Sequence, residues 1–398
     1  MKILQICHKP PYPPLDGGCI AINNISNGLL KECESLKILT IGTLKHPFEL
    51  KKYPKEFVKK TKIESVFVDT KLNIVDAFSN LVTYDSYNIS RFFSPDFNSL
   101  IIKTIKENNF DIILLESLFT TPYISTIRSH SKAKIVLRSH NLEHVIWKRL
   151  SKESNNPAKK IYLNLLSNQL KSYEINTLNQ VDGIAAISNE DEAKYKTLNC
   201  NAPITTIPFG INIENYDSKK IMVKNKIRFF HLGAMDWKPN LEGVGWLIKE
   251  IWPMIHEKIP NAELHLAGKN MPDWLVDEKT KNVYNHKDVK SATSFMNSYD
   301  VMIVPVLSAG GIRVKIIEGM ALGKTIISTT IGAEGLSYLK NENILIADHP
   351  NEFVKIAMNL ATDMALINRI GKNARKHVSE IYDQNKISKK LIEFCKSL

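Results

Sequence analysis

The chain has 398 residues, of which 43% are hydrophobic and 24% are charged, which is typical of a globular protein with two or three domains and excludes a disordered one. No apolar run approaches the roughly 20 residues of a transmembrane helix, so we expect no membrane span. The net charge is +12, and the five scattered cysteines form no Cys-x-x-Cys pair, which argues against a zinc site or a disulfide framework and for free thiols in a reducing cytoplasm.

The positive charge is concentrated in the first half of the chain. Residues 1–182 hold 25 Lys and Arg against 17 Asp and Glu, a net +8, and residues 183–398 hold 28 against 24, a net +4. Six lysines crowd one short segment: Lys51, Lys52, Lys55, Lys59, Lys60 and Lys62. Such a cluster would suit an anionic membrane or nucleic acid, or it is only a solvated face. No aromatic-interleaved basic motif accompanies it, so we do not favour nucleic acid.

Short β-branched runs alternate with helical stretches, which predicts parallel sheets covered by helices. The first run begins at Lys2 without the charged, apolar and small-residue regions of a signal peptide, so we expect none. Strands of the first half are predicted at Lys2–Cys7, Leu36–Gly42, Glu64–Asp69, Asp111–Glu116, Lys134–His140, Gly183–Ser188 and, more weakly, Ile204–Pro208. Helices are predicted at Ala21–Cys33, Asn98–Asn108 and Pro157–Gln180.

The same pattern then begins again. Strands of the second half are predicted at Arg228–Gly233, Glu263–Gly268, Asn282–Tyr284, Val301–Val306, Thr325–Thr330 and Ile344–Asp348. Pro239 suits the first turn of a helix whose apolar stripe consists of Val244, Leu247, Ile248, Ile251, Ile255 and Ile259. The polar segment Glu214–Lys226 is predicted to be the linker between the halves.

These elements predict an α/β protein of two doubly wound, Rossmann-like domains. We place them at residues 1–208 and 209–380, with a C-terminal helix of about residues 380–398 packed back on the first. Ligands of such sheets bind at the carboxyl ends of the strands, so we expect the active site in a cleft between two facing domains.

The loop from His8 to Gly18 is the first candidate for ligand binding. Its prolines stiffen the chain, and Gly17 and Gly18 let the backbone turn tightly and approach a ligand. The helix that follows has free N–H groups that favour a phosphate. The loop matches neither Gly-x-Gly-x-x-Gly nor a P-loop, so a plain strand-to-helix turn is the alternative.

The second candidate is the segment Arg138–His144, at the carboxyl end of a strand. His140 would hydrogen-bond a sugar hydroxyl or a phosphate there, and a histidine with purely structural partners is the alternative. His144 falls inside the following helix, where we favour the structural role.

The third candidate is a buried strand followed by a small-residue loop and a helix: Val301–Pro305, Ser308–Gly311 and Ile312–Ala321. Arg313 and Lys315 lie in the first helical turn, where cations oppose the helix dipole by about 0.3–1 kcal/mol each. A charge-assisted contact to a diphosphate contributes about 1.5–3 kcal/mol and would outweigh that cost. The alternative is a surface pair between Lys315 and Glu318, three residues apart.

Together these segments resemble a retaining glycosyltransferase of the large family 4, which has the GT-B fold. Nearly the whole chain takes part: the loop ending in Gly17-Gly18, Ser139–Asn141, Ile187-Ser188, Ile207–Asn212, Gly233–Trp237, and Gly310–Lys315 leading to Glu318. Each motif is loose by itself, but their order and spacing are specific.

The resemblance implies a role for each matching residue. His140 would lie near the transferred sugar, and Arg313 and Lys315 would act on the donor diphosphate. Other donor contacts are expected from Gly17, Gly18, Gly233, Asn285, His286, Gly310, Gly311, Ile312 and Glu318. Within this set Glu318 would bind the ribose hydroxyls, Asn285-His286 falls at the nucleobase loop, and Gly18 would approach the diphosphate from the other domain.

Two positions depart from the family pattern. Gly310 stands where the first acid of the Glu-x7-Glu motif is expected, which puts recognition of the donor sugar in doubt. Ala234 and Met235 follow Gly233, where the family has an arginine, and Arg313 and Lys315 would supply the missing charge. No Asp-x-Asp motif is present, so we expect neither a metal nor another cofactor.

We therefore expect a metal-independent, hexosyltransferase-like retaining enzyme that uses a nucleotide sugar to build surface polysaccharide or glycan. Its acceptor would be a sugar or a lipid-linked sugar, and its place the cytoplasm, peripheral to the inner face of an anionic membrane. The basic cluster would dock there, with Phe48, Leu50, Tyr53 and Phe57 as an apolar component. The alternatives are a nucleotide-sugar epimerase of the same fold and a non-catalytic sugar-nucleotide binder.

Overall fold

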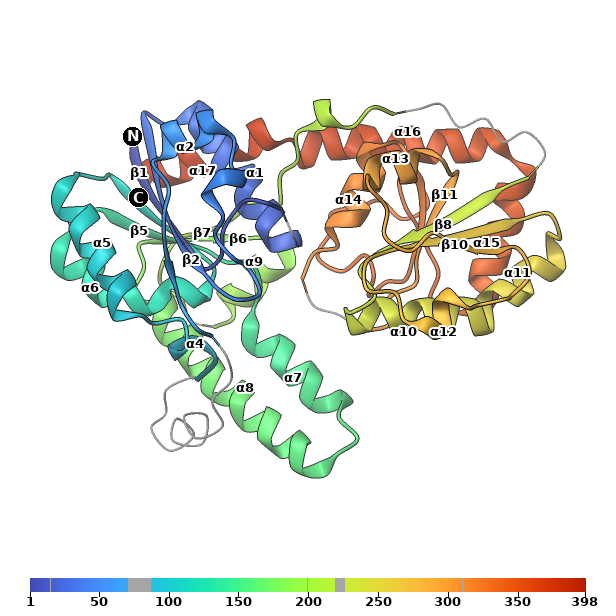
Figure 1. Ribbon diagram of the computed structural model, residues 1–398, viewed down its shortest axis with the longest axis horizontal. Helices are drawn as coiled ribbons and strands as arrows, with labels where there is room; N and C mark the ends of the chain where they lie inside the picture. The colour runs from blue at the N-terminus through green and yellow to red at the C-terminus, as the bar shows by residue number, and fades with distance from the viewer. Residues whose placement is uncertain (15, 71–86, 199, 219–225, 309–310) are drawn as a thin grey trace. The chain divides into compact units, whose positions relative to one another are not determined.

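The structure is a computed structural model that describes residues 1–14, 16–70, 87–198, 200–218, 226–308 and 311–398. The chain forms two compact units (Figure 1). The first contains Met1–Gly210 and Gln384–Leu398, and the second contains Ile211–Asp383.

The first unit is built on a seven-stranded parallel sheet with the order β3-β2-β1-β4-β5-β6-β7. Its strands are β1 (Lys2–Cys7), β2 (Ser35–Gly42), β3 (Glu64–Phe67), β4 (Ile112–Glu116), β5 (Lys134–Arg138), β6 (Gly183–Ala186) and β7 (Ile204–Thr206). The central strands are apolar on both faces because helices cover both. Cys7, Glu116 and Arg138 lie in register, so β1, β4 and β5 end side by side.

Two groups of helices cover this sheet. One face holds α1 (Gly17–Glu32), α2 (Lys55–Thr61) and α17 (Gln384–Lys396). The other holds α5 (Pro95–Glu107), α6 (Ile124–His130), the end of α8 (Pro157–Leu178), and α9 (Asn189–Lys196). Further short elements are η1 (Leu50–Lys52), α4 (Tyr87–Ser90) and η2 (Leu118–Tyr123). Helices α7 (Glu143–Glu153) and α8 pack against each other as a hairpin that projects from the unit (Figure 1).

The second unit has a six-stranded parallel sheet with the order β10-β9-β8-β11-β12-β13. Its strands are β8 (Arg228–Leu232), β9 (Glu263–Ala267), β10 (Val283–Asn285), β11 (Val301–Val304), β12 (Thr325–Ser328) and β13 (Leu345–Ile346). Its helices are η3 (Ile213–Asn215), α10 (Lys238–Trp246), α11 (Trp252–Lys258), α12 (Asp273–Val276), α13 (Ala292–Asn297), α14 (Val314–Ala321), α15 (Pro350–Thr362) and α16 (Met364–Ile381). A π-helical turn, Leu247–Ile251, joins α10 to α11, and the predicted apolar stripe packs into the core.

The chain passes from the first unit to the second two residues after the predicted boundary at residue 208 and before the predicted linker Glu214–Lys226. The division falls between Gly210 and Ile211, and Glu214–Ser218 of the predicted linker belongs to the second unit. Residues 219–225 of that linker lie outside the described residues. The chain returns between Asp383 and Gln384, so α17 belongs to the first unit and packs on α1. In the described parts of the chain, no helix has the length and apolar character needed to cross a membrane.

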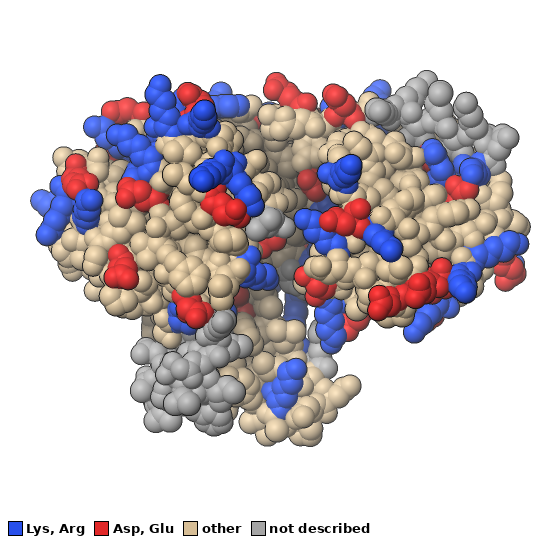
Figure 2. Space-filling view, in the orientation of Figure 1, with Lys and Arg blue, Asp and Glu red and all other residues tan. Residues whose placement is uncertain are grey.

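The lysine cluster lies on η1 and α2, where blue and red side chains are interspersed (Figure 2). Lys52 pairs with Glu49, and Lys60 pairs with Glu56. The expected apolar component is mostly wrong, because Tyr53 and Phe57 are buried in the core and Phe48 packs against it. Leu50 is the member of that set that is exposed.

Candidate active site

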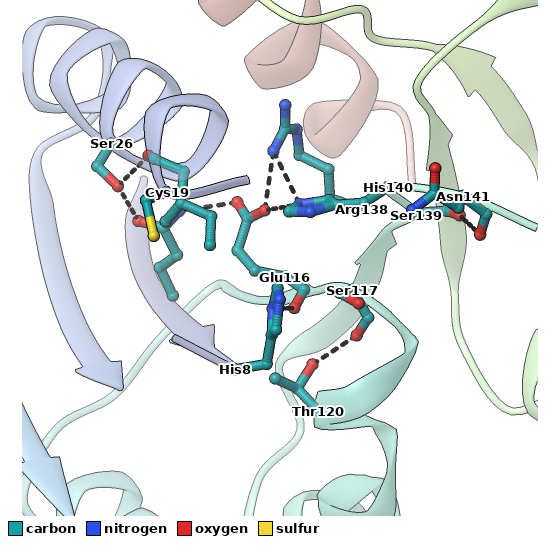
Figure 3. Close-up of polar contacts among 12 residues, drawn as sticks. His8, Cys19, Ser26, Glu116, Ser117, Thr120, Arg138, Ser139, His140 and Asn141 are labelled. Atoms are coloured by element: carbon teal, nitrogen blue, oxygen red, sulfur yellow. Dashed lines mark hydrogen bonds and ion pairs between the residues drawn. The ribbon is translucent and has the colours of Figure 1, made fainter. Parts of the chain in front are cut away.

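A buried carboxylate organises the strand ends of the first unit. Glu116, the last residue of β4, accepts hydrogen bonds from Gln5 Nε2, Arg138 Nη1 and His140 Nε2, each at 2.8 Å. His8 follows β1, and its Nδ1 lies 3.0 Å from the Glu116 carbonyl oxygen. Figure 3 shows Arg138 and His140 converging on the Glu116 carboxylate, with His8 beside it. The predicted residue His140 is therefore held by a carboxylate that sequence reasoning had treated only as part of a strand.

These contacts set the protonation of the two histidines. Burial opposes ionisation of Glu116, but Arg138, His140 and Gln5 outweigh it, and the pKa of Glu116 falls to about 2. Burial lowers the pKa of His140, and burial and then Lys9 lower the pKa of His8 well below its usual range. Both rings are then neutral at pH 7, with Nε2–H of His140 and Nδ1–H of His8 donating to Glu116. That tautomer assignment leaves His140 Nδ1 and His8 Nε2 as acceptors, with ring centroids 5.6 Å apart.

Arg138 is a second unusual group of this site. Its side chain is 1% exposed, and its Nε and Nη2 have no hydrogen-bond partner within the described part of the chain. A buried guanidinium held by one carboxylate is costly, because unsatisfied buried donors lose their hydration. The arrangement keeps Glu116 ionised and so keeps His140 in a fixed orientation.

The predicted glycines Gly17 and Gly18 begin α1, and Asp16 is the N-cap of that helix. Asp16 accepts from the Cys19 N–H at 2.9 Å and from Lys9 Nζ at 2.9 and 3.1 Å, and it lies 2.8 Å from His46 Nε2. A Cβ on Gly18 would lie 2.4 Å from Lys9 Nζ, so glycine at this position leaves room for the lysine beside the start of the helix. The structure therefore adds the cation Lys9 to the predicted anion site.

Asp16, Cys19 and His46 also place potential metal ligands within 4.8 Å of one another, the sole such group that the described residues contain. Both carboxylate oxygens of Asp16 already accept from the Lys9 ammonium. The positive charge beside the Asp16 carboxylate is therefore that of the Lys9 ammonium.

Two buried acids, Glu143 of α7 and Glu174 of α8, lie at the start of α7. Glu174 of α8 accepts from the N–H groups of Glu143 and His144, each at 3.0 Å, and from the His144 ring. Burial and then Glu174 raise the pKa of Glu143 to about 7. His144 therefore has the structural partner that we favoured from the sequence.

Lys315 is the centre of the candidate site in the second unit. It lies in the first turn of α14, and its Nζ donates to Asn240 Oδ1 at 2.7 Å and to the Leu232 carbonyl at 3.1 Å. His231 Nε2 lies 3.5 Å away, and His231 Nδ1 lies 2.9 Å from the Ile303 carbonyl. All three acceptors of the ammonium are neutral. Burial and then the neighbouring Arg313 lower the pKa of Lys315 to about 7.

Gly233, which follows β8, is packed directly against this lysine. A Cβ on Gly233 would lie 2.6 Å from Asn240 Nδ2 and 2.7 Å from Lys315 Nζ. Asn240 Nδ2 donates to the Ala234 carbonyl at 2.8 Å, which fixes the orientation of the amide. The structure thus brings together the predicted residues Gly233 and Lys315 through Asn240, which the sequence did not single out.

The loop before α14 carries the other predicted phosphate contacts. Arg313 is the N-cap residue of α14, is buried, and donates to the Ile331 carbonyl at 3.4 Å. Gly311 has φ of 75°, in the left-handed region that favours glycine, and Ile312 follows it half-buried. Gly310, the position of the missing motif acid, lies outside the described residues.

Glu318 lies one turn further along α14, and its partner is not the one that the helix spacing offers. The Tyr216 hydroxyl donates to Glu318 Oε1 at 2.9 Å. Burial raises the pKa of Glu318, and the Tyr216 hydrogen bond opposes that rise. Lys315 is bonded to Asn240, Leu232 and His231, so the alternative of a Lys315–Glu318 surface pair is wrong.

The predicted nucleobase residues Asn285 and His286 stand at the end of β10. Asn285 Nδ2 donates to the Leu275 carbonyl at 2.5 Å. His286 Nε2 lies 3.0 Å from His265 Nδ1 and 3.2 Å from the Tyr299 hydroxyl. Both side chains are therefore held by protein partners, and the backbone N–H of His286 donates to the Leu266 carbonyl at 2.8 Å.

The second unit is similar in sequence to a known protein family. Residues 226–363 match the family of glycosyl transferases group 1, and this segment contains Arg313, Lys315 and Glu318. The similarity to this family therefore lies within the second unit. Over 403 residues the chain is 24% identical to an uncharacterized 44.6 kDa protein in the cps region of Klebsiella pneumoniae, with 97% of each chain covered.

Solved structures show the predicted GT-B glycosyltransferase fold for the chain. Sucrose-phosphate synthase from Thermosynechococcus elongatus superimposes with a TM-score of 0.73 at 15% identity, covering 100% of this chain and 98% of that one. HepE from Anabaena in complex with UDP gives 0.69 at 15% identity, covering 100% of both chains. TarM of S. aureus in complex with fondaparinux, alpha-GlcNAc-glycerol and UDP gives 0.66 at 12% identity, covering 99% of both.

Proposed function

We propose that this glycosyltransferase transfers a sugar from a nucleotide-diphosphate sugar to an acceptor with retention of anomeric configuration and without a metal. Lys315 carries the proposal. It is a partly buried cation at the start of α14, it lies beside Arg313, and its hydrogen-bond acceptors are all neutral. An anionic ligand would supply the countercharge that these acceptors do not.

The second unit would hold the donor. Arg313 and Lys315 would bind the diphosphate, together with N–H groups of Gly311 and Ile312 at the start of the helix. Glu318 would accept hydrogen bonds from the ribose hydroxyls, either keeping or exchanging its bond from Tyr216. Gly233 would leave room for the diphosphate, and the loop at Asn285-His286 would contact the base.

The first unit would bind sugar hydroxyls. His140 Nδ1 and His8 Nε2 are neighbouring acceptors on rings whose other nitrogens are fixed by Glu116. Hydroxyl groups of the transferred sugar or of the acceptor are the donors that suit them. The start of α1, with Gly17, Gly18 and Lys9, would contribute positive potential for phosphate.

The chemistry would be mainly electrostatic. As the bond between the anomeric carbon and the diphosphate breaks, negative charge grows on the leaving phosphate oxygen. Preformed cations and N–H groups stabilise that charge, and such electrostatic stabilisation is usually the largest single contribution to lowering the activation barrier of an enzyme reaction. The departing oxygen can take the proton of the acceptor hydroxyl on the same face of the sugar, so no protein base is required.

UDP-sugars are the first donors to test, because HepE has been solved in complex with UDP and with UDP-glucose. The cps region that encodes the Klebsiella pneumoniae relative makes capsule-type polysaccharide acceptors the first choice. A thermal-shift screen of UDP-, GDP- and ADP-sugars would be followed by transfer assays with chelator present, and by NMR of the new linkage. The proposed sugar transfer would be contradicted by an epimerised donor or by binding without turnover. An inverted linkage would contradict retention, and loss of activity in chelator would contradict metal independence.

A further inference from the structure

The projecting α7–α8 hairpin carries exposed aliphatic side chains at its outer end. Ile161 is 65% exposed, Leu165 is 50% exposed and Leu150 is 45% exposed. Ile161 and Leu165 are four residues apart and so share one face of α8. Ser151 Oγ bonds to the Lys160 carbonyl at 2.9 Å, which places Leu150 at the level of Ile161. We define the hairpin end as residues 148–165.

The same hairpin end is strongly basic. Its cations are Lys148, Arg149, Lys152, Lys159 and Lys160, and its single acid is Glu153, so its net charge is five minus one, or +4. Lys159 and Lys160 lie in the first turn of α8, which contains no acid. Cations there oppose the helix dipole, so they do not serve the stability of the helix. In Figure 2 the end of the hairpin is largely tan with a blue side chain on it.

The inner part of the hairpin is firmly anchored, so the outer end is a rigid projection. Glu174 accepts two backbone N–H groups at the start of α7, and Ser167 Oγ donates to the His144 carbonyl at 2.9 Å. Leu170 packs with Ile89 and Leu118 in a small core cluster. A projection held this way can enter a partner without rearrangement of the sheet.

We propose that the hairpin end docks the chain on an anionic lipid surface. Leu150, Ile161 and Leu165 would enter the headgroup layer, and the surrounding lysines would contact anionic headgroups with their stems along the apolar side chains. A second copy of the chain is a poorer partner, because like hairpin ends would bring +4 against +4. This surface replaces the Lys51–Lys62 cluster, whose aromatic residues are buried and whose lysines are partly paired.

The test is co-sedimentation of the full chain with vesicles of phosphatidylglycerol and phosphatidylcholine, against phosphatidylcholine alone, at low and high salt. Two variants change the hairpin end: one combines Leu150→Ser, Ile161→Ser and Leu165→Ser, and the other combines Lys148→Gln, Lys152→Gln, Lys159→Gln and Lys160→Gln. The matched control removes four lysines elsewhere: Lys51→Gln, Lys52→Gln, Lys55→Gln and Lys59→Gln. Circular dichroism melting establishes that each variant is folded.

We expect the wild type to bind the anionic vesicles at low salt, with about tenfold weaker binding in each hairpin variant and unchanged binding in the control. The proposal is overturned if the control loses binding and the hairpin variants keep it. It is also overturned if lipid charge has no effect, if no vesicle is bound, or if the serine variant changes only the oligomeric state. The assay needs no sugar transfer, so a chain that binds vesicles but transfers no sugar would contradict only the proposed function.

Discussion

Lys315 Nζ lies 2.7 Å from Asn240 Oδ1, and this contact joins the start of α14 to the loop that follows β8. With Leu232 and His231, Asn240 gives the ammonium one acceptor for each of its three protons. The lysine is thereby aimed at Gly233 before any donor binds. A phosphate at this position would replace one of these acceptors at a preoriented cation and would not have to order a flexible one.

We predict that Arg313→Ala and Lys315→Ala each weaken binding of a nucleoside diphosphate about tenfold or more and binding of the matching nucleoside much less. The reason is that a charge-assisted hydrogen bond to phosphate is worth about 1.5–3 kcal/mol, and a nucleoside cannot form it. Isothermal titration calorimetry with both ligands measures the difference. Equal losses for the two ligands would exclude a role in diphosphate binding.

Diphosphate affinity should fall as pH rises through about 7, the pKa of buried Lys315. Above that pH the free protein must take up a proton to present the ammonium, which costs up to about tenfold in affinity per pH unit. Stability should change in the opposite sense. The unfolded lysine titrates near 10.4, so between about pH 7 and 10 the unfolded state holds more protons and this residue favours folding more as pH rises.

The control for this pH dependence is Lys315→Met, which removes the titrating group and leaves the ionisation of the nucleotide itself unchanged. Calorimetry of wild type and variant from about pH 6 to about pH 9 should show the steeper fall in the wild type. Parallel curves would mean that another group controls the binding.

Glu318→Gln should lower donor affinity about tenfold while leaving the fold intact, because a carboxylate binds two ribose hydroxyls about 1.5 kcal/mol better than an amide does. Tyr216→Phe is the matched control, since it removes the hydrogen bond to Glu318 without touching the carboxylate. A Glu318→Gln variant that binds donor normally and melts several degrees lower would show that the acid serves only the contact with Tyr216.

His140→Ala should lower kcat about a hundredfold and change the donor KM much less, because its contact is proposed to matter most in the transition state. His144→Ala provides the comparison. His144 is bound to buried Glu174, so its loss should lower the melting temperature and leave kcat nearly unchanged. Steady-state kinetics and melting curves of both variants separate these roles, and a KM effect alone for His140→Ala would contradict the prediction.

The strands were predictable because their signal is local. Lys2–Cys7 was predicted at its observed bounds, since a short, mainly apolar run is the pattern of a strand buried on both faces. The two doubly wound domains followed from repetition of that pattern in two halves, and the GT-B fold was implied by the resemblance of the motifs to family 4. Both helices of the hairpin were expected, because His144 was placed inside a helix and Pro157–Gln180 was predicted as another, but their packing together as a projecting hairpin was not predicted.

The partners of the site residues were not predictable, because they are remote in the sequence. Lys315 bonds to residues 75, 83 and 84 positions away, and Glu318 bonds to Tyr216, 102 positions away. Helix spacing therefore suggested Lys315 as the partner of Glu318, whereas tertiary packing places Tyr216 there. Glu116 was missed for a similar reason. Its position at the end of a predicted strand was the one signal in the sequence, and its role as the partner of Gln5, Arg138 and His140 depends on β4 lying between β1 and β5.

The last prediction concerns Glu143, whose pKa is raised to about 7 by burial and then by Glu174. An unfolded glutamate titrates near 4.3, so the folded state holds more protons between about pH 4.3 and 7, and stability is lost as pH rises through that window. Glu143→Gln should therefore raise the melting temperature at pH 8, by roughly 2–4 °C for each kcal/mol of relieved cost, and have little effect near pH 4.

Glu174→Gln is the matched control for Glu143→Gln, because Glu174 accepts two backbone N–H groups and the His144 ring at the start of α7. Removing its charge weakens hydrogen bonds that the helix start needs, so it should lower the melting temperature at pH 8. Scanning calorimetry of both variants at the two pH values decides the matter. If Glu143→Gln destabilises the chain at pH 8, the Glu143 carboxylate must be stabilised by a cation, with Lys9, whose charge already acts on it, as the first candidate.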